Sequence, residues 1–367
     1  MSERKLVTVR RIDTIVRHTQ SANLNVVTID GWQIVVSRQL GFAVEEQVLF
    51  CEIDSFLPAS DARLRMPGNS TKYDGTQGHR VLTTMVSAQI SQGAIFHLRD
   101  FPEIMDELTR LPIEDHGNTD FAEKLGVKKW QLPTGKKAQA NLGSFPVFIG
   151  NCSSVRVQNC PNFFTKPKYK KLVYQETVKM DGCTVTCYFV RKDSPYYKSL
   201  PDLPGDAASS AHVVHDNGRF GVCTNNSDLK HALDSIPWQA AIHYGIPSKL
   251  AALGKNIAIQ GELVGSTIQK NRHEYPEGEH EFLVFSVFDI DKQERWCPLE
   301  VESFAASQRL EHVGVLGYHA LPDIARHHED LLARASTHPD EGLVFKCLQD
   351  GRWFKVISNY YLLKHGI

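Results

Sequence analysis

A lysine set between two strand-like runs is the first candidate for chemistry in this sequence. It lies in the segment Val178-Lys179-Met180-Asp181-Gly182, and the apolar run 183–189 follows without a break. Two strands joined by such a turn can hold an ammonium group at the mouth of a pocket, where burial and nearby cations lower its pKa. Lys179 is therefore a candidate nucleophile, although Asp and Gly in a short turn are also typical of an ordinary solvated loop.

Four segments downstream of this turn combine acidic, basic and aromatic residues with short apolar runs. They cover residues 260–265, 282–290, 341–346 and 353–359. Taken singly, each is explained by an ordinary strand that carries a charged residue. In this fixed order after the lysine turn, they resemble the motifs of the covalent nucleotidyltransferase superfamily, which comprises RNA ligases, DNA ligases and mRNA capping enzymes.

The resemblance implies a reaction in which a lysine carries AMP from ATP to RNA. Lys179 would attack the α-phosphorus of ATP, expel pyrophosphate and hold AMP as a phosphoramidate. The RNA 5'-phosphate would then take the AMP, and a 3'-hydroxyl would displace it to join the strands. Because the attack needs a neutral amine, we expect burial, a metal ion or neighbouring lysines to lower the pKa of Lys179.

The resemblance also implies a set of nucleotide-binding residues, assigned one position at a time. Asp181 and Gly182 would shape the turn, and Gly182 would let the backbone come close to the nucleotide. Glu262 would form a hydrogen bond with the ribose. Phe288 would stack on the adenine, with Asp289 beside it.

Phosphoryl transfer leaves a protein mainly the tasks of positioning and of neutralising charge. The resemblance implies that Lys346 and Lys355 contact the phosphates, with Arg156 as a further contact to nucleotide or RNA phosphate. It implies that Glu341 holds a divalent cation, and a hard cation bound by few carboxylates and many waters suits Mg²⁺ or Mn²⁺. The expected cofactors are therefore ATP and either Mg²⁺ or Mn²⁺.

Two positions depart from the pattern of these ligases. Superfamily members commonly end with two lysines spaced K-x-K, but the residue two places after Lys355 is Ile357, unless Lys364 folds back to replace the second lysine. Where RNA ligases usually place an arginine, this sequence has Asn225. Each change removes a cation that could hold phosphate or ribose. A slow ligase and a catalytically silent RNA-binding protein therefore both stay open as alternatives.

Residues 1–100 read as short strands separated by turns. Asp30-Gly31 joins two of them directly, which is the signal of a two-residue hairpin. Several short strands at this spacing suggest a small closed barrel of the OB type. The runs 30–36, 50–58 and 89–93 resemble the OB module that precedes the catalytic core in RNA ligases of the Deinococcus type.

The rest of the chain divides into a connector and a second domain. The spacing of Ile104, Leu108 and Leu111 predicts a helical connector within residues 101–144, in which the stretch 133–143 is the expected linker. Residues 145–367 read as strands with a few helices. We therefore expect an α+β protein, an OB-type β-barrel followed by an RNA ligase-like adenylyltransferase domain built on antiparallel sheets.

The composition is that of a globular protein with one basic stretch. The 367 residues are 42% hydrophobic, the formal net charge is −1, and the 8 cysteines lack C-x-x-C spacing. Neither a zinc site nor a disulfide framework is expected from these cysteines. Between Asp120 and Gln175, ten basic residues stand against two acidic ones, with aromatic residues among them. This mixture fits contact with nucleic acid, although a solvated face would carry the same charges.

Without a membrane-length apolar run or a signal sequence, we expect a soluble intracellular monomer with no membrane partner. The leading hypothesis is an ATP-dependent RNA ligase that repairs breaks with 3'-hydroxyl and 5'-phosphate ends, in RNA such as a nicked duplex or an RNA/DNA hybrid. A capping-type guanylyltransferase is the alternative of the same class, and a silent RNA-binding protein with this fold is the alternative of another class. The OB module before the core speaks against DNA ligases and capping enzymes, where the resemblance places that domain C-terminally.

Overall fold

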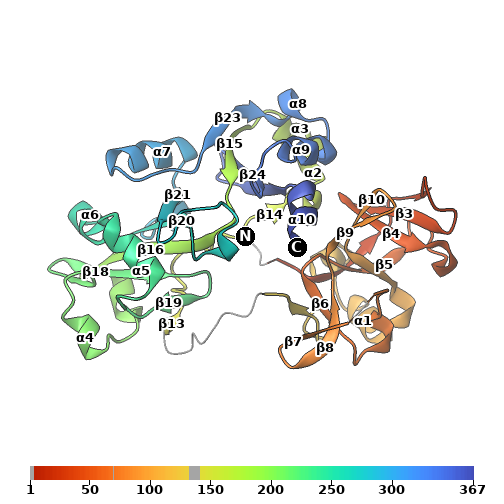
Figure 1. The fold of residues 1–367 in the computed structure, drawn as a ribbon, viewed down its shortest axis with the longest axis horizontal. Coiled ribbons are helices and arrows are strands. Elements are labelled where there is room, and N and C mark those ends of the chain that lie inside the picture. Colours follow the sequence, from red (N-terminus) through yellow and green to blue (C-terminus); the bar gives the residue numbers. More distant parts are fainter. Residues whose placement is uncertain (1–3, 69, 132–140) are drawn as a thin grey trace.

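The computed structural model describes residues 4–68, 70–131 and 141–367. It has two domains side by side, the N-terminal one in red and orange and the C-terminal one in green and blue (Figure 1). Helices and mostly antiparallel strands occur together, which confirms the predicted α+β class. Within the described part of the chain, no helix is long and apolar enough to cross a lipid bilayer.

The N-terminal domain is a small barrel of short antiparallel strands. Its first six strands are β1 (Val7–Arg11), β2 (Thr14–Arg17), β3 (Leu24–Ile29), β4 (Trp32–Ser37), β5 (Gln47–Cys51) and β6 (Ser55–Pro58). The next five are β7 (Thr71–Tyr73), β8 (Thr76–Arg80), β9 (Thr83–Val86), β10 (Gln89–Gln92) and β11 (Ala94–His97). Ile29 pairs with Trp32 across Asp30 and Gly31, so the predicted two-residue hairpin is confirmed.

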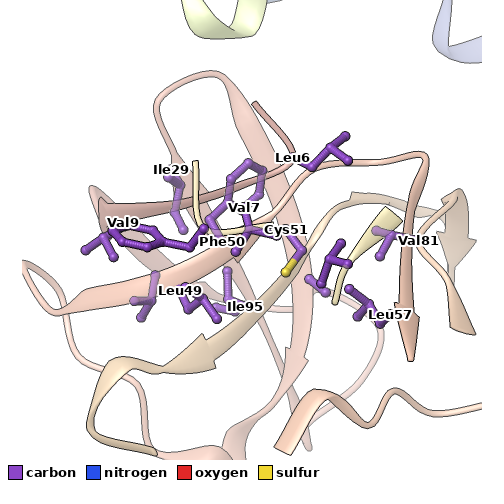
Figure 2. Close-up of a cluster of buried hydrophobic side chains, with 14 of the residues drawn as sticks. Leu6, Val7, Val9, Ile29, Leu49, Phe50, Cys51, Leu57, Val81 and Ile95 are labelled. Carbon is purple, nitrogen blue, oxygen red and sulfur yellow. The ribbon is translucent and has the colours of Figure 1, made fainter. Parts of the chain in front are cut away.

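One hydrophobic core fills the barrel (Figure 2). Val7, Leu49 and Phe50 are fully buried in it. The connector contributes to the same core, because Ile104 and Leu108 of α1 (Pro102–Leu108) are buried there, followed by residues of the segment 121–127. Apart from its last residues, the predicted connector therefore packs as part of the barrel.

The predicted linker 133–143 lies largely outside the described residues, which resume at Asn141. Its final residues begin a strand, β13 (Asn141–Ser144), that pairs with β19 (Ser227–Leu229) of the C-terminal domain. Just before the gap, β12 (Lys128–Lys129) pairs with β6 of the barrel. The change from one domain to the other therefore falls between β12 and β13.

The C-terminal domain is built on two sheets. The larger sheet contains β13, β16 (Cys183–Arg191), β17 (Val214–His215), β18 (Gly218–Cys223), β19, β20 (Ile257–Gly265), β21 (His280–Asp289) and β22 (Glu294–Arg295). The smaller sheet contains β14 (Val155–Arg156), β15 (Val173–Lys179), β23 (Val315–Ala320), β24 (Gly342–Cys347) and β25 (Trp353–Ile357). β15 belongs to one sheet and β16 to the other, so residues 180–182 carry the chain from sheet to sheet.

Helices cover the outer faces of these sheets. α5 (Ile236–His243), α6 (Ile246–Leu253) and α7 (Pro298–Ser307) pack into the core of the larger sheet. α8 (Leu321–Ile324) and α9 (His328–Ala335) pack into the core of the smaller one. The remaining helices are short: α2 (Asn162–Thr165), α3 (Pro167–Lys170), α4 (Gly205–Ala208) and α10 (Asn359–His365).

The two domains are in direct contact. The backbone N–H of Gly31, at the tip of the barrel hairpin, donates to the carbonyl of Gln158 at 3.0 Å. A Cβ atom at Gly31 would lie 2.6 Å from the Cα of Gln158, so only glycine allows this approach. On the other side, Ile357 and Leu362 of the C-terminal domain are buried in the barrel core. These contacts place the barrel beside the edge of the smaller sheet.

Candidate nucleotidyl transfer site

The candidate nucleophile lies where the chain crosses between the two sheets. Lys179 is the last residue of β15, and it pairs in register with Gly342 at the start of β24. Glu341 precedes that strand, and its carboxylate accepts a hydrogen bond and ion pair from the Nζ of Lys179. The structure therefore brings together a lysine and a carboxylate that are far apart in sequence and that the resemblance names as nucleophile and metal ligand.

A second carboxylate lies beside this pair. Glu262 on β20 accepts hydrogen bonds from the backbone N–H of Gly182 at 3.1 Å and from the hydroxyl of Thr184 at 3.2 Å. Burial raises the pKa of Glu262 to about 7, and the charge of Lys179 offsets part of this rise. Lys179, Glu262 and Glu341 thus form one charged cluster between the sheets.

The electrostatic state of Lys179 differs from the expectation. Burial favours the neutral amine, but the charges of Glu341 and Glu262 outweigh it and raise the pKa of Lys179 above its ordinary value. The predicted lowering of this pKa is therefore wrong for the protein chain by itself. The protein chain by itself holds Lys179 as an ammonium. The positive charge that would lower the pKa of this group has to come from a bound ligand such as a metal ion.

Gly182 is needed for packing between strands. A Cβ atom at this position would lie 2.6 Å from the carbonyl oxygen of Leu263 and 2.8 Å from the Cγ of Glu262. The close neighbour of Gly182 in this structure is therefore strand β20, whereas the resemblance implies that a nucleotide lies beside it. The missing side chain lets the turn come near enough for its N–H to reach the Glu262 carboxylate.

Asp181 is also occupied by the protein. Its carboxylate accepts a hydrogen bond from the hydroxyl of Tyr361 on α10 at 2.7 Å and an ion pair from Arg272, in the loop after β20. Its backbone N–H donates to the Nε2 of His273 at 3.2 Å. Asp181 thus ties the lysine turn to two neighbouring segments.

Lys355 and Arg156 lie on adjacent parallel strands at the edge of the smaller sheet, where they pair in register. Burial, together with the charges of Arg156, Lys179 and Arg4, lowers the pKa of Lys355 to about 7. Burial also lowers the pKa of Arg156 to about 10. Its Nε and Nη1 atoms have no hydrogen-bond partner among the described residues, and its nearest ion-pair distance is 3.9 Å, to Asp54. These cations are available to an anion.

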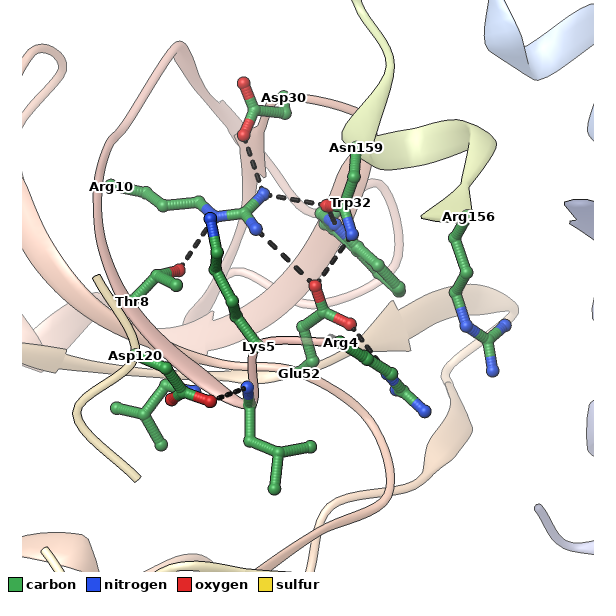
Figure 3. A network of polar contacts seen from close by, with 12 residues as sticks. Arg4, Lys5, Thr8, Arg10, Asp30, Trp32, Glu52, Asp120, Arg156 and Asn159 are labelled. Carbon is green, nitrogen blue, oxygen red and sulfur yellow. Dashed lines mark hydrogen bonds and ion pairs between the residues drawn. The ribbon is translucent and has the colours of Figure 1, made fainter. Parts of the chain in front are cut away.

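A cavity of about 540 Å³ opens between the barrel and the C-terminal domain beside these two residues. The cations that line it are Arg4, Lys5, Arg10, Arg11, Arg156 and Lys355, against the acids Asp13, Asp30 and Glu52. Figure 3 shows Glu52 at the centre of the barrel side, bonded to Arg4 at 3.1 Å and to Asn159 at 2.7 Å. The excess of positive charge makes the cavity suitable for a polyanion.

Sequence reasoning missed the cations of the barrel. Arg4 and Arg10 reach the cavity because the first strand lies against the C-terminal domain, a tertiary contact that no local pattern reports. The one available signal was the density of basic residues before position 12, with Arg4-Lys5 and Arg10-Arg11 in close succession.

Three of the expected nucleotide contacts lie away from this cluster. Lys346 is 6% exposed, and its ammonium donates to the carbonyl of Phe285 at 2.7 Å. Burial lowers its pKa to about 7. It is four residues along β24 from the partner of Lys179, a distance of roughly 13 Å. In this structure Lys346 therefore lies apart from Lys179, with its ammonium bonded to a carbonyl inside the domain.

Phe288 and Asp289 lie toward the far end of β21. The ring of Phe288 is 4% exposed, and a Cβ at Gly150 would lie 2.6 Å from it, with the guanidinium of Arg295 at 5.7 Å from its centroid. In this structure the ring is therefore buried, with Gly150 and Arg295 as neighbours. Asp289 accepts a hydrogen bond from the backbone N–H of Lys292 at 3.0 Å and caps the turn before β22.

The structure shows where Ile357 and Asn225, the two departures from the ligase pattern, lie. Ile357 pairs with Gly342, directly across β24 from Lys179, and it is buried in the barrel core at 2% exposure. The place of the second lysine is therefore filled by a contact between the domains. Lys364 is exposed on α10 and does not fold back to replace it. Asn225 lies exposed in the turn between β18 and β19.

Comparison with known proteins agrees with this geometry. A family model for RNA ligases matches residues 172–357, and a model for an OB-fold domain matches residues 6–98. No protein in the curated set matches the chain.

Three solved structures of the RNA ligase from Naegleria gruberi are similar over almost the entire chain. A mutant without ligand has a TM-score of 0.83 at 29% identity, covering 100% of this chain and 99% of that one. The complex with pyrophosphate has a TM-score of 0.82 at 28% identity, covering 99% of both chains. A mutant with ATP and Mn has a TM-score of 0.82 at 29% identity, covering 99% of this chain and 100% of that one. Since the ligase model also spans half of the sequence, this chain belongs to the RNA ligase family.

Proposed function

We propose that this protein is an ATP-dependent RNA ligase that joins 3'-hydroxyl and 5'-phosphate ends and serves RNA repair. The observation that carries the proposal is the cluster of Lys179, Glu341 and Glu262 at the crossing between the sheets. The Naegleria gruberi ligase, which was solved with ATP and Mn and with AMP and Mn, supports these ligands for the present chain. The finer assignment to the Deinococcus type stays a prediction.

The first step is attack by Lys179 on the α-phosphorus of ATP. The ammonium first loses one proton to become the neutral amine; a bond then forms between Nζ and phosphorus, the bond from phosphorus to the oxygen shared with the β-phosphate breaks, and pyrophosphate leaves while a second proton passes from Nζ to solvent. Because Lys179 is the end of a paired strand, its reach is fixed before ATP binds. Such fixed positioning is a main source of rate in phosphoryl transfer.

The second and third steps return the lysine and join the strands. A 5'-phosphate oxygen of RNA attacks the AMP phosphorus, the bond to Nζ breaks, and Lys179 recovers a proton. The 3'-hydroxyl then attacks the 5'-phosphorus and releases AMP. The same lysine pocket therefore serves two transfers of AMP, and the third step uses AMP only as a leaving group.

The carboxylates present fit a divalent cation. Glu341 places an oxygen donor beside Lys179, and a cation held by few carboxylates suits Mg²⁺ or Mn²⁺, which keep several waters. When bound, the cation would neutralise the carboxylate charge that now raises the pKa of Lys179 and would stabilise charge on the α-phosphate. Glu341, which already contacts the amine, is the residue proposed to hold it.

The basic cavity supplies a place for the triphosphate. Lys355 and Arg156 lie on its wall, and Arg156 has unpaired N–H groups among the described residues. The barrel adds Arg4 and Arg10 from the other side. These cations would hold the β- and γ-phosphates and draw pyrophosphate away from the attacking amine.

The experiment that tests the proposal is strand sealing. A duplex with one nick between a 3'-hydroxyl and a 5'-labelled phosphate is incubated with the protein, ATP and Mg²⁺ or Mn²⁺, with RNA or DNA placed on either side of the nick. Conversion to a joined strand that resists phosphatase is the expected result when the nick is in RNA. RNA binding without sealing would instead support the silent RNA-binding alternative, and transfer from GTP in preference to ATP would support a capping-type enzyme.

A further inference from the structure

The loop between β20 and β21, residues 266–279, has an unusual backbone where it lies against the lysine turn. Gln269, Lys270 and Asn271 are consecutive residues with φ values of 45°, 61° and 51°. This left-handed region is unfavourable for residues that carry a side chain, and it persists where surrounding contacts fix it. The contacts of this loop therefore indicate what its shape serves.

Three of these contacts hold the lysine turn itself. The side-chain amide of Gln269 donates to the carbonyl of Gly182 at 3.2 Å. The guanidinium of Arg272 forms an ion pair with the carboxylate of Asp181. His273 accepts a hydrogen bond from the backbone N–H of Asp181, with 3.2 Å between the nitrogen atoms. One loop thus holds two backbone groups and one carboxylate of the turn.

The bond from Asp181 fixes the state of the His273 ring. The Nε2 atom accepts from an N–H group and so carries no hydrogen, which places the hydrogen of the neutral ring on Nδ1. This Nδ1 lies 3.9 Å from a carboxylate oxygen of Asp340, and the His273 side chain is 16% exposed. Asp340 directly precedes Glu341, the expected metal ligand. The ring therefore lies between the lysine turn and the segment that carries Glu341.

We infer that His273 is a positioning residue for the attack of Lys179 on ATP, and that it acts as the acceptor for the backbone N–H of Asp181. The inference rests on the proposed function and goes beyond it, because His273 lies outside the five segments that resemble ligase motifs.

The short distance along the chain makes this bond effective. Asp181 follows Lys179 by two residues, so a shift of its backbone N–H moves the backbone that carries the amine. A displacement of about 1 Å in a reacting group can lower a rate by about 10²-fold. Because the bond holds the backbone of the turn, its loss should affect the rate of attack more than the binding of ATP.

Two amide variants that differ by one methylene group provide a matched test. In His273→Gln, the side-chain carbonyl can reach the place of Nε2 and accept from the Asp181 N–H. In His273→Asn, the carbonyl is too short and reaches only the place of Nδ1. Both variants remove the imidazole, so a difference between them reports on the acceptor.

Lysyl-AMP formation is measured in a single turnover over a range of ATP concentrations. We expect His273→Asn to lower the rate at saturating ATP by about tenfold with little change in half-saturation. We expect His273→Gln to stay within about twofold of the wild type. Equal rates in the two variants, whether both are normal or both are slow, would overturn the inference.

Sealing of pre-adenylated RNA separates positioning from general damage. This step does not use Lys179 as a nucleophile, so His273→Asn should seal pre-adenylated RNA at the rate of the wild type, which would also show that the variant is folded. An equal loss in both reactions would show a merely structural role and overturn the inference. A wild type that forms no lysyl-AMP would overturn the proposed function, and this inference with it, before the variants are compared.

Discussion

The ammonium of Lys179 and the carboxylate of Glu341 are paired where two neighbouring strands meet the turn, with Lys179 at the end of β15 and Glu341 directly before β24. This pairing keeps the nucleophile charged and in place until ligands arrive, since the carboxylates of the cluster raise the pKa of the amine. It also means that one carboxylate has two possible roles, as counterion of the lysine and as ligand of a cation.

Replacement of Glu341 by Gln separates these roles. If the carboxylate acted only as a counterion, its loss would lower the pKa of Lys179 and speed the attack at neutral pH. If it holds the cation that stabilises the α-phosphate, lysyl-AMP formation should fall by about 10²-fold or more. We expect the fall, measured in a single turnover with Mg²⁺ and again with Mn²⁺. A faster reaction in the variant would contradict the assignment of Glu341.

Gly182→Ala should damage the site through packing. The new Cβ would lie 2.6 Å from a backbone carbonyl, which cannot move without disturbing β20. We expect the free energy of unfolding to drop by about 1–3 kcal/mol and lysine adenylation to be lost. Gly205→Ala is the matched control, because a Cβ there meets nothing within 4 Å. Equal stability of the two variants in urea unfolding would refute this account of Gly182.

Binding of the triphosphate should weaken as pH rises through neutrality. The pKa of Lys355 is lowered to about 7 in the free protein, so the ammonium is mostly charged below pH 7 and mostly neutral above it. Phosphate binding favours the charged form, and affinity is therefore highest on the acid side of this range. The measurement is the dissociation constant of an unreactive α,β-methylene analogue of ATP between pH 6 and pH 9.

Lys355→Arg is the control for this dependence. Arginine stays protonated over the whole range, so the variant should bind the analogue with a flatter pH profile than the wild type. Glu262, whose pKa is also about 7, is unchanged in both proteins. Identical profiles would assign the pH dependence to a group other than Lys355.

The basic helix α3 offers a prediction about RNA. Lys168, Lys170 and Lys171 are exposed at this helix, at the end of the smaller sheet opposite Lys179. If they contact phosphates, neutralising all three should reduce the slope of log affinity against log salt by about 2 to 3. A triple variant of Lys192, Lys198 and Lys292, which are exposed elsewhere, is the control. An unchanged slope in the first variant would remove α3 from the RNA surface.

The sequence was sufficient to predict the parts of the site that depend on order along the chain. The segments around Lys179, Glu341 and Lys355 were assigned from spacing and resemblance, and they lie together because β15, β24 and β25 are neighbours in one sheet. Glu262 joins them from the other sheet, because β16, which follows the lysine turn, pairs with β20. The hairpin at Asp30 was also predictable, because a two-residue turn is a local signal.

The contacts that were missed depend on packing between distant segments. Phe288 is enclosed by Gly150 and Arg295, and only the folded sheet brings Gly150 to that ring. Lys346 reaches the carbonyl of Phe285 on a different strand. In the same way, the cations that Arg4 and Arg10 add to the cavity depend on how one domain sits against the other. Periodicity and motif order carry no information on such contacts.

The most direct measurement of the central claim is the transfer of label from α-labelled ATP to the protein. The wild type and Lys179→Ala are incubated with Mg²⁺ or Mn²⁺ after removal of any bound AMP, denatured, and digested to locate the labelled peptide. We expect acid-labile label on the wild type alone, in the peptide that contains Lys179. Equal label on the variant, or none on the wild type, would contradict the assignment of Lys179 as the nucleophile.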